Sequence, residues 1–412
     1  MRFESRHVCL CVVGAALLGL LVAAVGGAQT APNPAGAQMA EQVFKSVVVL
    51  KGISVNEFMD TMGFLSASLS YNCTDCHGED AVDNWANFAK DTEKKNIARK
   101  MILMVKMINQ TQFGGKRMVT CYTCHRGDAS PKITPNLAVQ YAPGEDVDAN
   151  ELELANRPAT QESTSADQIF NKYFQAIGDA QSLGSFTTLL AKGTYSGYDT
   201  DNQKVPVDIY AKAPAQMTTI VHAPLGDSVR VFDGRSGWIA SPDRPVPLLP
   251  LTGGDVTGAK IDAMLVFSTG IRQLYPQWRV ADTTIEGKDV WMLEGVAPGQ
   301  LPLKLYFDQE SGLLVRALRL IDTAIGYNPT QLDFSDYRLV SGIRVPYHQV
   351  ITWTDNQVTI DLTNVQLNTA IEAIKFAQPP PARPRRSNDG VESLFSGYFF
   401  GFGSSPDWVR FA

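Results

Sequence analysis

The sequence predicts a multidomain protein with a small, mostly α-helical domain followed by a larger α+β domain built on an antiparallel sheet. Three observations lead to this prediction. Apolar residues recur at helical spacing before each of two short cysteine motifs between residues 45 and 130. Apolar and polar residues then alternate with a period of two in several segments of residues 205–367. A stretch rich in proline and acidic residues, 131–164, separates the two patterns and is expected to be a linker.

The first 28 residues have the features of an export signal. Two arginines precede an apolar stretch from Val8 to Val25, which ends in the small residues before Gln29. We expect this segment to direct the protein to the periplasm and to be cleaved after Ala28. The alternative is an uncleaved anchor in the inner membrane, because the apolar stretch is almost long enough to span it. Residues 29–44 are expected to be a linker, since alanine, glycine, proline and glutamine dominate them.

Two helices are expected in the small domain, residues 45–130. Ser54 begins a capping box, which predicts a helix ending near Leu69. Asp91 is placed to cap a second helix over residues 92–109, where apolar side chains recur at helical spacing. Each helix precedes one cysteine motif. The domain has little hydrophobic mass of its own, so a bound group must supply much of its core.

Two copies of the pattern C-x-x-C-H carry the chemistry of the small domain. This spacing is typical of covalent haem attachment, in which both thiols bond to the porphyrin and the histidine ligates the iron. A zinc site is the alternative, but zinc ribbons hold their cysteine pairs about 15–20 residues apart, whereas 44 residues separate the pairs here. The sequence therefore predicts two covalently bound c-type haems. The predicted attachment residues and proximal ligands are Cys73, Cys76, His77, Cys121, Cys124 and His125.

The sixth iron ligand is expected to be methionine. Of the five histidines, one lies in the export signal and two belong to the motifs. The remaining two, His222 and His348, fall on strands expected in the other domain, where we interpret them as structural. A thioether ligand also raises the potential of a c-type haem. The methionines available in the small domain are Met59, Met62, Met101, Met104, Met107 and Met118.

Two segments resemble a known family. The residues from Met62 to His77 and from Ala98 to Gly127 resemble haem-binding repeats of the tetrahaem cytochrome subunit of photosynthetic reaction centres. In that family a helix carries the methionine ligand and the attachment motif follows a turn. The resemblance therefore implies that Met62 and Met104 are the axial ligands.

Some ligand alternatives stay open. Met101 is an alternative to Met104 because both lie on one helix face. Met59 and Met107 are interpreted as core residues. The chain departs from the family in one respect, since it has two attachment motifs and not four.

The resemblance implies a function in electron transport rather than enzymatic catalysis. A haem iron with both axial positions filled passes single electrons and offers no open position to a substrate. The implied partners are a redox protein donor and an acceptor, such as a membrane complex. The sequence is compatible with both photosynthetic and respiratory electron transport. The formal net charge of −6 and the pI near 5.5 argue against a nucleic-acid partner.

Residues 165–377 are expected to form the α+β domain. Ser165 begins a capping box for a helix ending near Ile177, and strands and hairpins follow. Parts of these strands resemble outer-membrane lipoprotein-sorting proteins, which implies a curved, half-barrel sheet around an apolar cavity. The segments that carry this resemblance are residues 209–214, 232–238, 306–316 and 336–346.

This second resemblance supplies an alternative function. The protein would bind an apolar ligand or lipid in the periplasm and use its haems as a redox sensor or docking module. A cavity filled by the protein's own side chains is the simpler interpretation. Residues 378–412 are expected to form a flexible tail that begins with a proline- and arginine-rich spacer.

Overall fold

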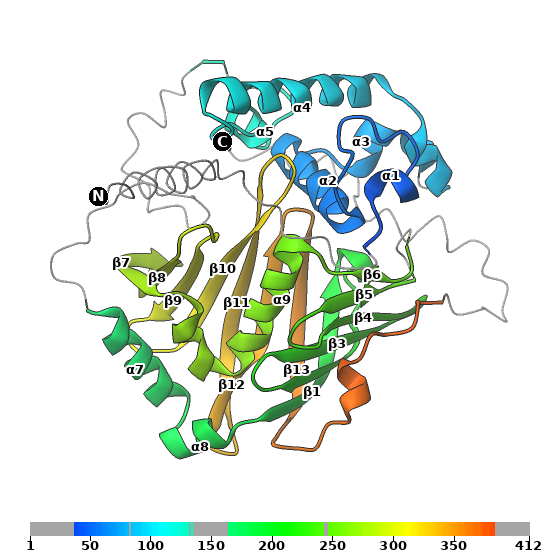
Figure 1. Cartoon of the computed structure of the whole chain (residues 1–412). Coiled ribbons are helices and arrows are strands. Elements are labelled where there is room, and N and C mark those ends of the chain that lie inside the picture. Colours follow the sequence, from blue (N-terminus) through cyan, green and yellow to red (C-terminus); the bar gives the residue numbers. More distant parts are fainter. Residues whose placement is uncertain (1–36, 82–83, 132, 135–163, 243–245, 384–412) are drawn as a thin grey trace, which may run out of the picture. The chain divides into compact units, whose positions relative to one another are not determined.

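The computed structural model describes residues 37–81, 84–131, 133–134, 164–242 and 246–383 (Figure 1). The predicted export signal lies outside the described residues, as do most of the predicted linker at 131–164 and most of the predicted tail. The described residues all belong to one compact unit. In the described part of the chain, no helix is both long and apolar enough to cross a membrane.

The region that contains the cysteine motifs is helical, as predicted. Ser54 caps α2, and its hydroxyl accepts a hydrogen bond from the Glu57 amide at 3.2 Å. The second long helix begins one residue later than expected, because Thr92 rather than Asp91 is its N-cap. Asp91 instead lies 2.7 Å from the Arg99 guanidinium. The helices are α1 (Ala40–Val43), α2 (Val55–Leu69), α3 (Cys73–His77), η1 (Glu79–Ala81), η2 (Trp85–Ala89), α4 (Glu93–Gln112) and α5 (Cys121–His125).

The rest of the fold is a single antiparallel sheet of 13 strands, curved and unclosed (Figure 1). Its order is β6-β5-β4-β3-β2-β1-β13-β12-β11-β10-β9-β8-β7. The strands are β1 (Thr188–Gly197), β2 (Val205–Lys212), β3 (Gln216–Ala223), β4 (Gly226–Phe232), β5 (Gly237–Ala240), β6 (Leu249–Pro250), β7 (Gln277–Ile285), β8 (Lys288–Val296), β9 (Leu303–Asp308), β10 (Leu314–Asp322), β11 (Tyr327–Val340), β12 (Ile343–Trp353) and β13 (Asn356–Leu367).

Neighbours in this sheet are neighbours in sequence, with one exception. The first and last strands, β1 and β13, pair in the middle, where Tyr195 lies opposite Ile360. The two edges are therefore β6 and β7, which are consecutive along the chain. The connection between them contains α9 (Gly253–Val266) and η4 (Ser268–Leu274), and Figure 1 shows α9 lying across the sheet.

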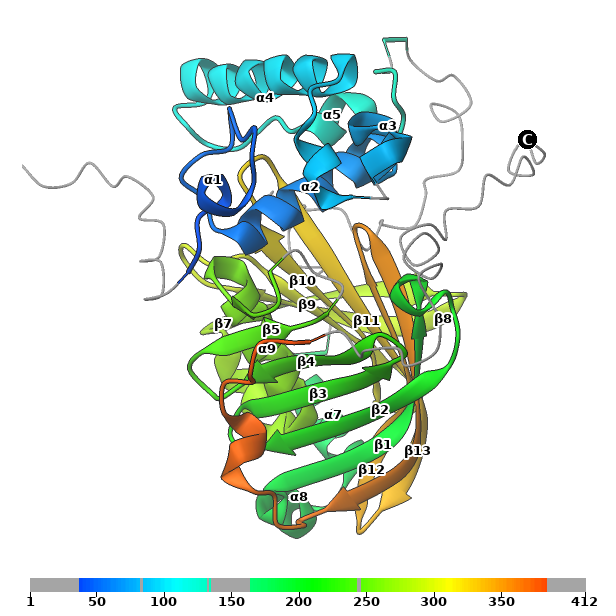
Figure 2. The same cartoon turned by 90° about the vertical axis from the view of Figure 1, so that its right-hand side faces the viewer.

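Further helices precede β1 and follow β13 along the chain. Ser165 caps α7 (Ala166–Ile177) through the reciprocal capping box predicted from the sequence, and α8 (Ala180–Ser185) follows. Near the end of the described residues, η5 (Ala373–Phe376) packs beside β3, because the Thr218 hydroxyl donates to the Lys375 carbonyl at 2.7 Å (Figure 2).

Hydrogen bonds join the helix α2 to residues of the sheet region. The hydroxyls of Ser54 and Thr252 are 2.7 Å apart and buried. The Asn56 amide donates to the Pro250 carbonyl at 2.6 Å, and the Asn328 amide donates to the Asp60 carbonyl at 2.9 Å. Helix α2 and its N-cap therefore pack against the sheet region as well as within the helical region.

Candidate functional site

Each C-x-x-C-H motif forms a one-turn helix of its own. In α3 the Asn72 side chain accepts a hydrogen bond from the Asp75 amide at 2.9 Å, and the Asp75 carboxylate accepts one from the Asn72 amide at 2.9 Å. Thr120 and Thr123 form the corresponding capping box of α5. Residues three and four apart share a helix face. The helical turn therefore puts the second cysteine and the histidine of each motif on the same face as the first cysteine.

Both motif histidines are oriented in the same way. The Nδ1 atom of His77 lies 3.0 Å from the Phe88 carbonyl, and the Nδ1 atom of His125 lies 3.0 Å from the Asp128 carbonyl. A carbonyl only accepts hydrogen bonds, so Nδ1 carries a proton, and in the neutral ring the lone pair is then on Nε2. Iron-ligating histidines have this arrangement, in which a backbone acceptor fixes the tautomer and the ring orientation.

The surroundings of His77 also favour the neutral ring. Burial lowers the pKa of His77 below its usual value, and the Phe88 ring packs against it with the ring centroids 4.9 Å apart. A neutral imidazole is the form that ligates a metal ion.

The four motif cysteines differ in burial. Cys73 and Cys124 are exposed, Cys76 is half-buried and Cys121 is buried. None of the described cysteines forms a disulfide. Burial raises the pKa of the Cys121 thiol to about 11, so this thiol is protonated at neutral pH. Among the described residues, no group of three or more histidine, cysteine, aspartate or glutamate side chains lies close enough to hold a metal ion.

The predicted methionine ligands lie on the two long helices. Met62, on α2, is half-buried and packs against a cluster that contains Cys121 and Ile102. Met104, on α4, is 39% exposed, and its alternative Met101 is 36% exposed. The interpretation of Met107 as a core residue is wrong, because this side chain is 59% exposed.

One long helix presents an apolar surface that the described residues do not cover. Helix α4 packs through the side that includes Ile102 and Val105, and its other apolar side chains are exposed. Exposed apolar groups of this extent on one helix indicate a surface that a bound group or partner covers. The exposed large apolar side chains of α4 are Ile97, Met101, Leu103, Met104 and Met107.

The helical region has two halves, each with one long helix and one attachment helix, and hydrogen bonds connect them. The Thr92 hydroxyl at the start of α4 donates to the Cys76 carbonyl of α3 at 2.5 Å. The Gly127 amide after α5 donates to the Ser68 carbonyl of α2 at 3.1 Å. Each attachment helix is therefore fixed by a bond to the long helix of the other half.

Asn109 holds the turn that leads into the second motif. Its side-chain oxygen accepts hydrogen bonds from the amides of Met118 and Val119, both at 2.9 Å. Its side-chain nitrogen donates to the Val119 carbonyl at 2.7 Å. The buried Asn109 side chain therefore fixes the chain two residues before Cys121.

These features have counterparts among known proteins. Residues 22–186 match the family of photosynthetic reaction centre cytochrome C subunits. The reaction-centre cytochrome c subunit of Rubrivivax gelatinosus is 38% identical over 98 residues, which cover 23% of this chain and 25% of that protein. The subunit of Thermochromatium tepidum is 37% identical over 97 residues, which cover 23% of each chain. The resemblance predicted from the motifs is confirmed, and the chain spans about a quarter of the length of these curated relatives.

Solved structures also resemble part of the chain. A LolA superfamily protein from Nitrosomonas europaea is 14% identical, covers 52% of this chain and 98% of its own, and has a TM-score of 0.34. An outer membrane lipoprotein-sorting protein domain from Vibrio parahaemolyticus is 11% identical, covers 50% of this chain and 97% of its own, and has a TM-score of 0.33. These scores are too low for either structure to bear on function.

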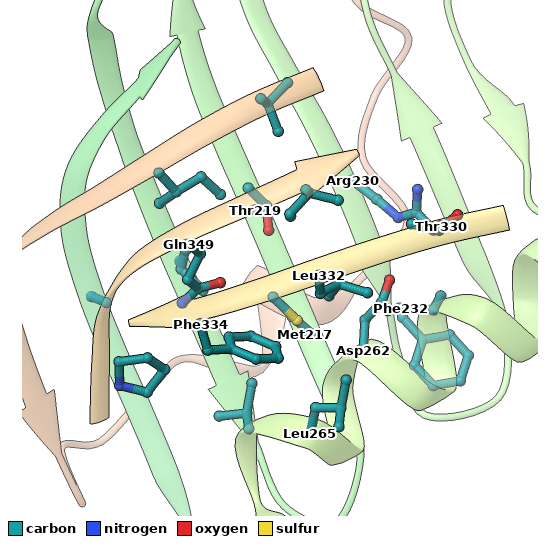
Figure 3. Close-up of a pocket in the computed structure, with 18 of the residues that line it drawn as sticks. Met217, Thr219, Arg230, Phe232, Asp262, Leu265, Thr330, Leu332, Phe334 and Gln349 are labelled. Atoms are coloured by element: carbon teal, nitrogen blue, oxygen red, sulfur yellow. The ribbon is translucent and has the colours of Figure 1, made fainter. Parts of the chain in front are cut away.

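The sheet contains a second candidate site, a cavity of about 430 Å³. This volume lies within the usual range for small-molecule sites, about 300–1,000 Å³. Most of its lining is apolar, and the sheet strands and α9 contribute most of the residues (Figure 3). Three residues of α2, Asn56, Met59 and Asp60, also line it. Met59, which we interpreted as a core residue, instead lies on the cavity wall.

The charged residues that line the cavity are Asp60, Asp199, Asp255, Asp262, Arg230, Arg319 and Arg344. Arg319 is 6% exposed at its side chain, and its guanidinium binds both carboxylate oxygens of Asp262 at 2.8 and 2.9 Å. Arg230 also lines the cavity (Figure 3), and its buried Nη2 atom has no hydrogen-bond partner in the described structure. The sequence does not mark Arg230 as a cavity residue, because one arginine between valines is typical of a solvent-facing strand position.

The two histidines outside the motifs lie on strands, as predicted. His222 on β3 lies 3.1 Å from Asp227 and 3.6 Å from Asp208. His348 on β12 lies 2.7 Å from Asp361. Each therefore has a carboxylate neighbour within the sheet, as expected for a structural histidine.

Proposed function

We propose that this chain is an exported c-type cytochrome that carries two covalently bound haems and transfers single electrons. The orientation of His77 and His125 carries the proposal, because each ring presents Nε2 while a backbone carbonyl holds Nδ1. The match to the reaction-centre cytochrome family supports haem-based electron transfer. The number of haems rests on the two motifs, and export to the periplasm rests on residues 1–28.

The cysteines and histidines of the two motifs are suited to bind haem. When bound, the haem iron supplies a one-electron couple. The thiols of each motif would attach one porphyrin, and His77 and His125 would each ligate an iron. Met62 and Met104 would be the further ligands, which would leave no open position for substrate chemistry. The exposed apolar face of α4 would exclude water from the attached group.

The domain organisation belongs to the same proposal. Residues 45–130 would form the dihaem domain, and residues 165–377 would form the domain that contains the sheet. A redox donor and acceptor, such as a membrane complex, would exchange electrons with the first domain. Residues 131–164 would then link the two, with residues 29–44 and 378–412 outside them.

Redox titration of methionine variants tests the ligand assignment. Met62→Ala and Met104→Ala are each expected to lower the potential of one haem, because a thioether ligand raises it. Met107→Ala is the matched control, since Met107 is an exposed methionine on the same helix as Met104. Wild-type potentials and spectra in both ligand variants would overturn the assignment. If Met101→Ala lowered the potential of a haem and Met104→Ala did not, the ligand would be Met101, one helical turn before Met104.

We propose a second candidate function for the sheet region, the binding of an apolar ligand or lipid, with the haems as a redox sensor or docking module. The cavity of about 430 Å³ with its mainly apolar wall favours it. Native mass spectrometry of gently purified protein is expected to show a bound ligand that denaturation releases. Absence of any such ligand, together with no uptake of added amphiphiles, would contradict this second candidate.

A further inference from the structure

On β4 the side chains that line the cavity alternate with valines. On β4, Ser228, Arg230 and Phe232 line the cavity, whereas the intervening Val229 and Val231 do not. Side chains alternate between the two faces of a strand, so the register turns the arginine towards the cavity. Thr219, which lies opposite Arg230 on β3, lines the cavity as well (Figure 3).

Arg230 carries a buried donor that the protein does not satisfy. Its Nη2 atom is buried and makes no hydrogen bond within the described residues. A guanidinium cannot lose its proton in a protein, so it cannot escape this cost by becoming neutral. Buried polar groups are hydrogen-bonded in the great majority of cases, and an exception requires an explanation.

The carboxylate of Asp262, which also lines the cavity, already has a partner. Both its oxygens bind the Arg319 guanidinium, and Arg319 also donates to the Thr330 hydroxyl at 3.2 Å. Arg319 is thus a satisfied structural cation of the wall, whereas Arg230 presents an unsatisfied donor. The difference between the two arginines indicates that Arg230 is held ready for an acceptor that the described residues do not supply.

We propose that the cavity binds a single-chain amphiphile with an anionic head group, and that Arg230 binds this head group. The proposal rests on the second candidate function and specifies its ligand. A carboxylate or a phosphate monoester accepts hydrogen bonds from a guanidinium in the same way, so both head groups share the required chemistry. The Thr219 hydroxyl adds a second polar contact, and the hydrocarbon chain packs against the apolar wall, which includes Met217, Leu265 and Phe334 (Figure 3).

Calorimetric titration of the full haem-loaded protein, after removal of bound lipid, tests the proposal. The probes are dodecanoate, dodecyl phosphate and dodecanol, which have the same chain and differ in the head group. We expect dodecanoate or dodecyl phosphate to bind roughly 10- to 100-fold more tightly than dodecanol, the usual effect of a hydrogen bond to a charged group. Comparison of the two anions identifies which head group the site prefers.

Two arginine variants distinguish a role of Arg230 in head-group binding from a role in the stability of the fold. Arg230→Met is expected to reduce anion binding to the dodecanol level without weakening dodecanol binding. It should not lower the melting temperature, because it removes a buried donor that has no partner. Arg235→Met is the matched control, since Arg235 is exposed in the turn after β4, and it should bind all three probes as the wild type does.

Each other outcome contradicts a defined part of the proposal. Equal affinity for the three probes would overturn the role of the head group and leave the apolar-ligand candidate in place. Failure of all three to bind would overturn both. A large fall in melting temperature for Arg230→Met, with dodecanol binding lost as well, would show that Arg230 is structural. The number of haems per chain is independent of all these results.

Discussion

The side chain of Asn109 gives a prediction whose size follows from three hydrogen bonds. Asn109→Ala removes two bonds accepted from the amides of Met118 and Val119 and one donated to the Val119 carbonyl. Each bond contributes about 0.5–1.5 kcal/mol net, so the loss should total roughly 2–4 kcal/mol of unfolding free energy. Because these bonds fix the turn before Cys121, we also expect incomplete haem attachment at the second motif.

Urea unfolding of the haem-loaded protein, followed by haem absorbance, measures the effect. The control is Asn96→Ala, an exposed asparagine on the same helix whose side chain accepts one bond from Arg99 at 2.8 Å. Both variants replace asparagine by alanine in the same helix and so gain the same helix propensity. The difference between their unfolding free energies therefore measures the contribution of the turn. If Asn109→Ala were no less stable than Asn96→Ala, the account of this turn would be refuted.

Further predictions concern packing and capping. Gly326→Ala should cost about 1–3 kcal/mol in thermal or urea unfolding, because an added methyl group meets the buried Phe64 ring. Arg319→Met should cost about 3 kcal/mol, since it leaves Asp262 unpaired with only 20% of its side chain exposed; unchanged stability would contradict the pairing. Thr92→Ala should cost about 1 kcal/mol through loss of the α4 cap, and Thr92→Ser should restore most of it in the same urea assay.

Local signals predicted much of the secondary structure correctly. The caps Ser54 and Ser165 begin helices as expected, and the hairpin turning at Glu286 and Gly287 is present between β7 and β8. These features depend on contacts between residues close in sequence, which a single sequence contains. The pairing of β1 with β13 joins distant segments, and nothing local specified it.

The helix α9 and the place of Arg230 on the cavity wall were not predicted, and both omissions have physical reasons. Gly254 and Gly258 suggest a loop, yet they let α9 approach the Ile321 and Arg319 side chains closely. The alternation around Arg230 indicates a strand, but it does not say which face is covered. The motif residues were predictable because haem attachment requires a fixed spacing, whereas the assignment of Met62 and Met104 stays a prediction.

The central claim is that both motifs attach haem, and the haem content of the purified full chain tests it most directly. A pyridine haemochrome assay should give two haems per chain for the wild type. It should give one haem when Cys121 and Cys124 are replaced together by alanine. A wild-type content of one haem or none would contradict the account.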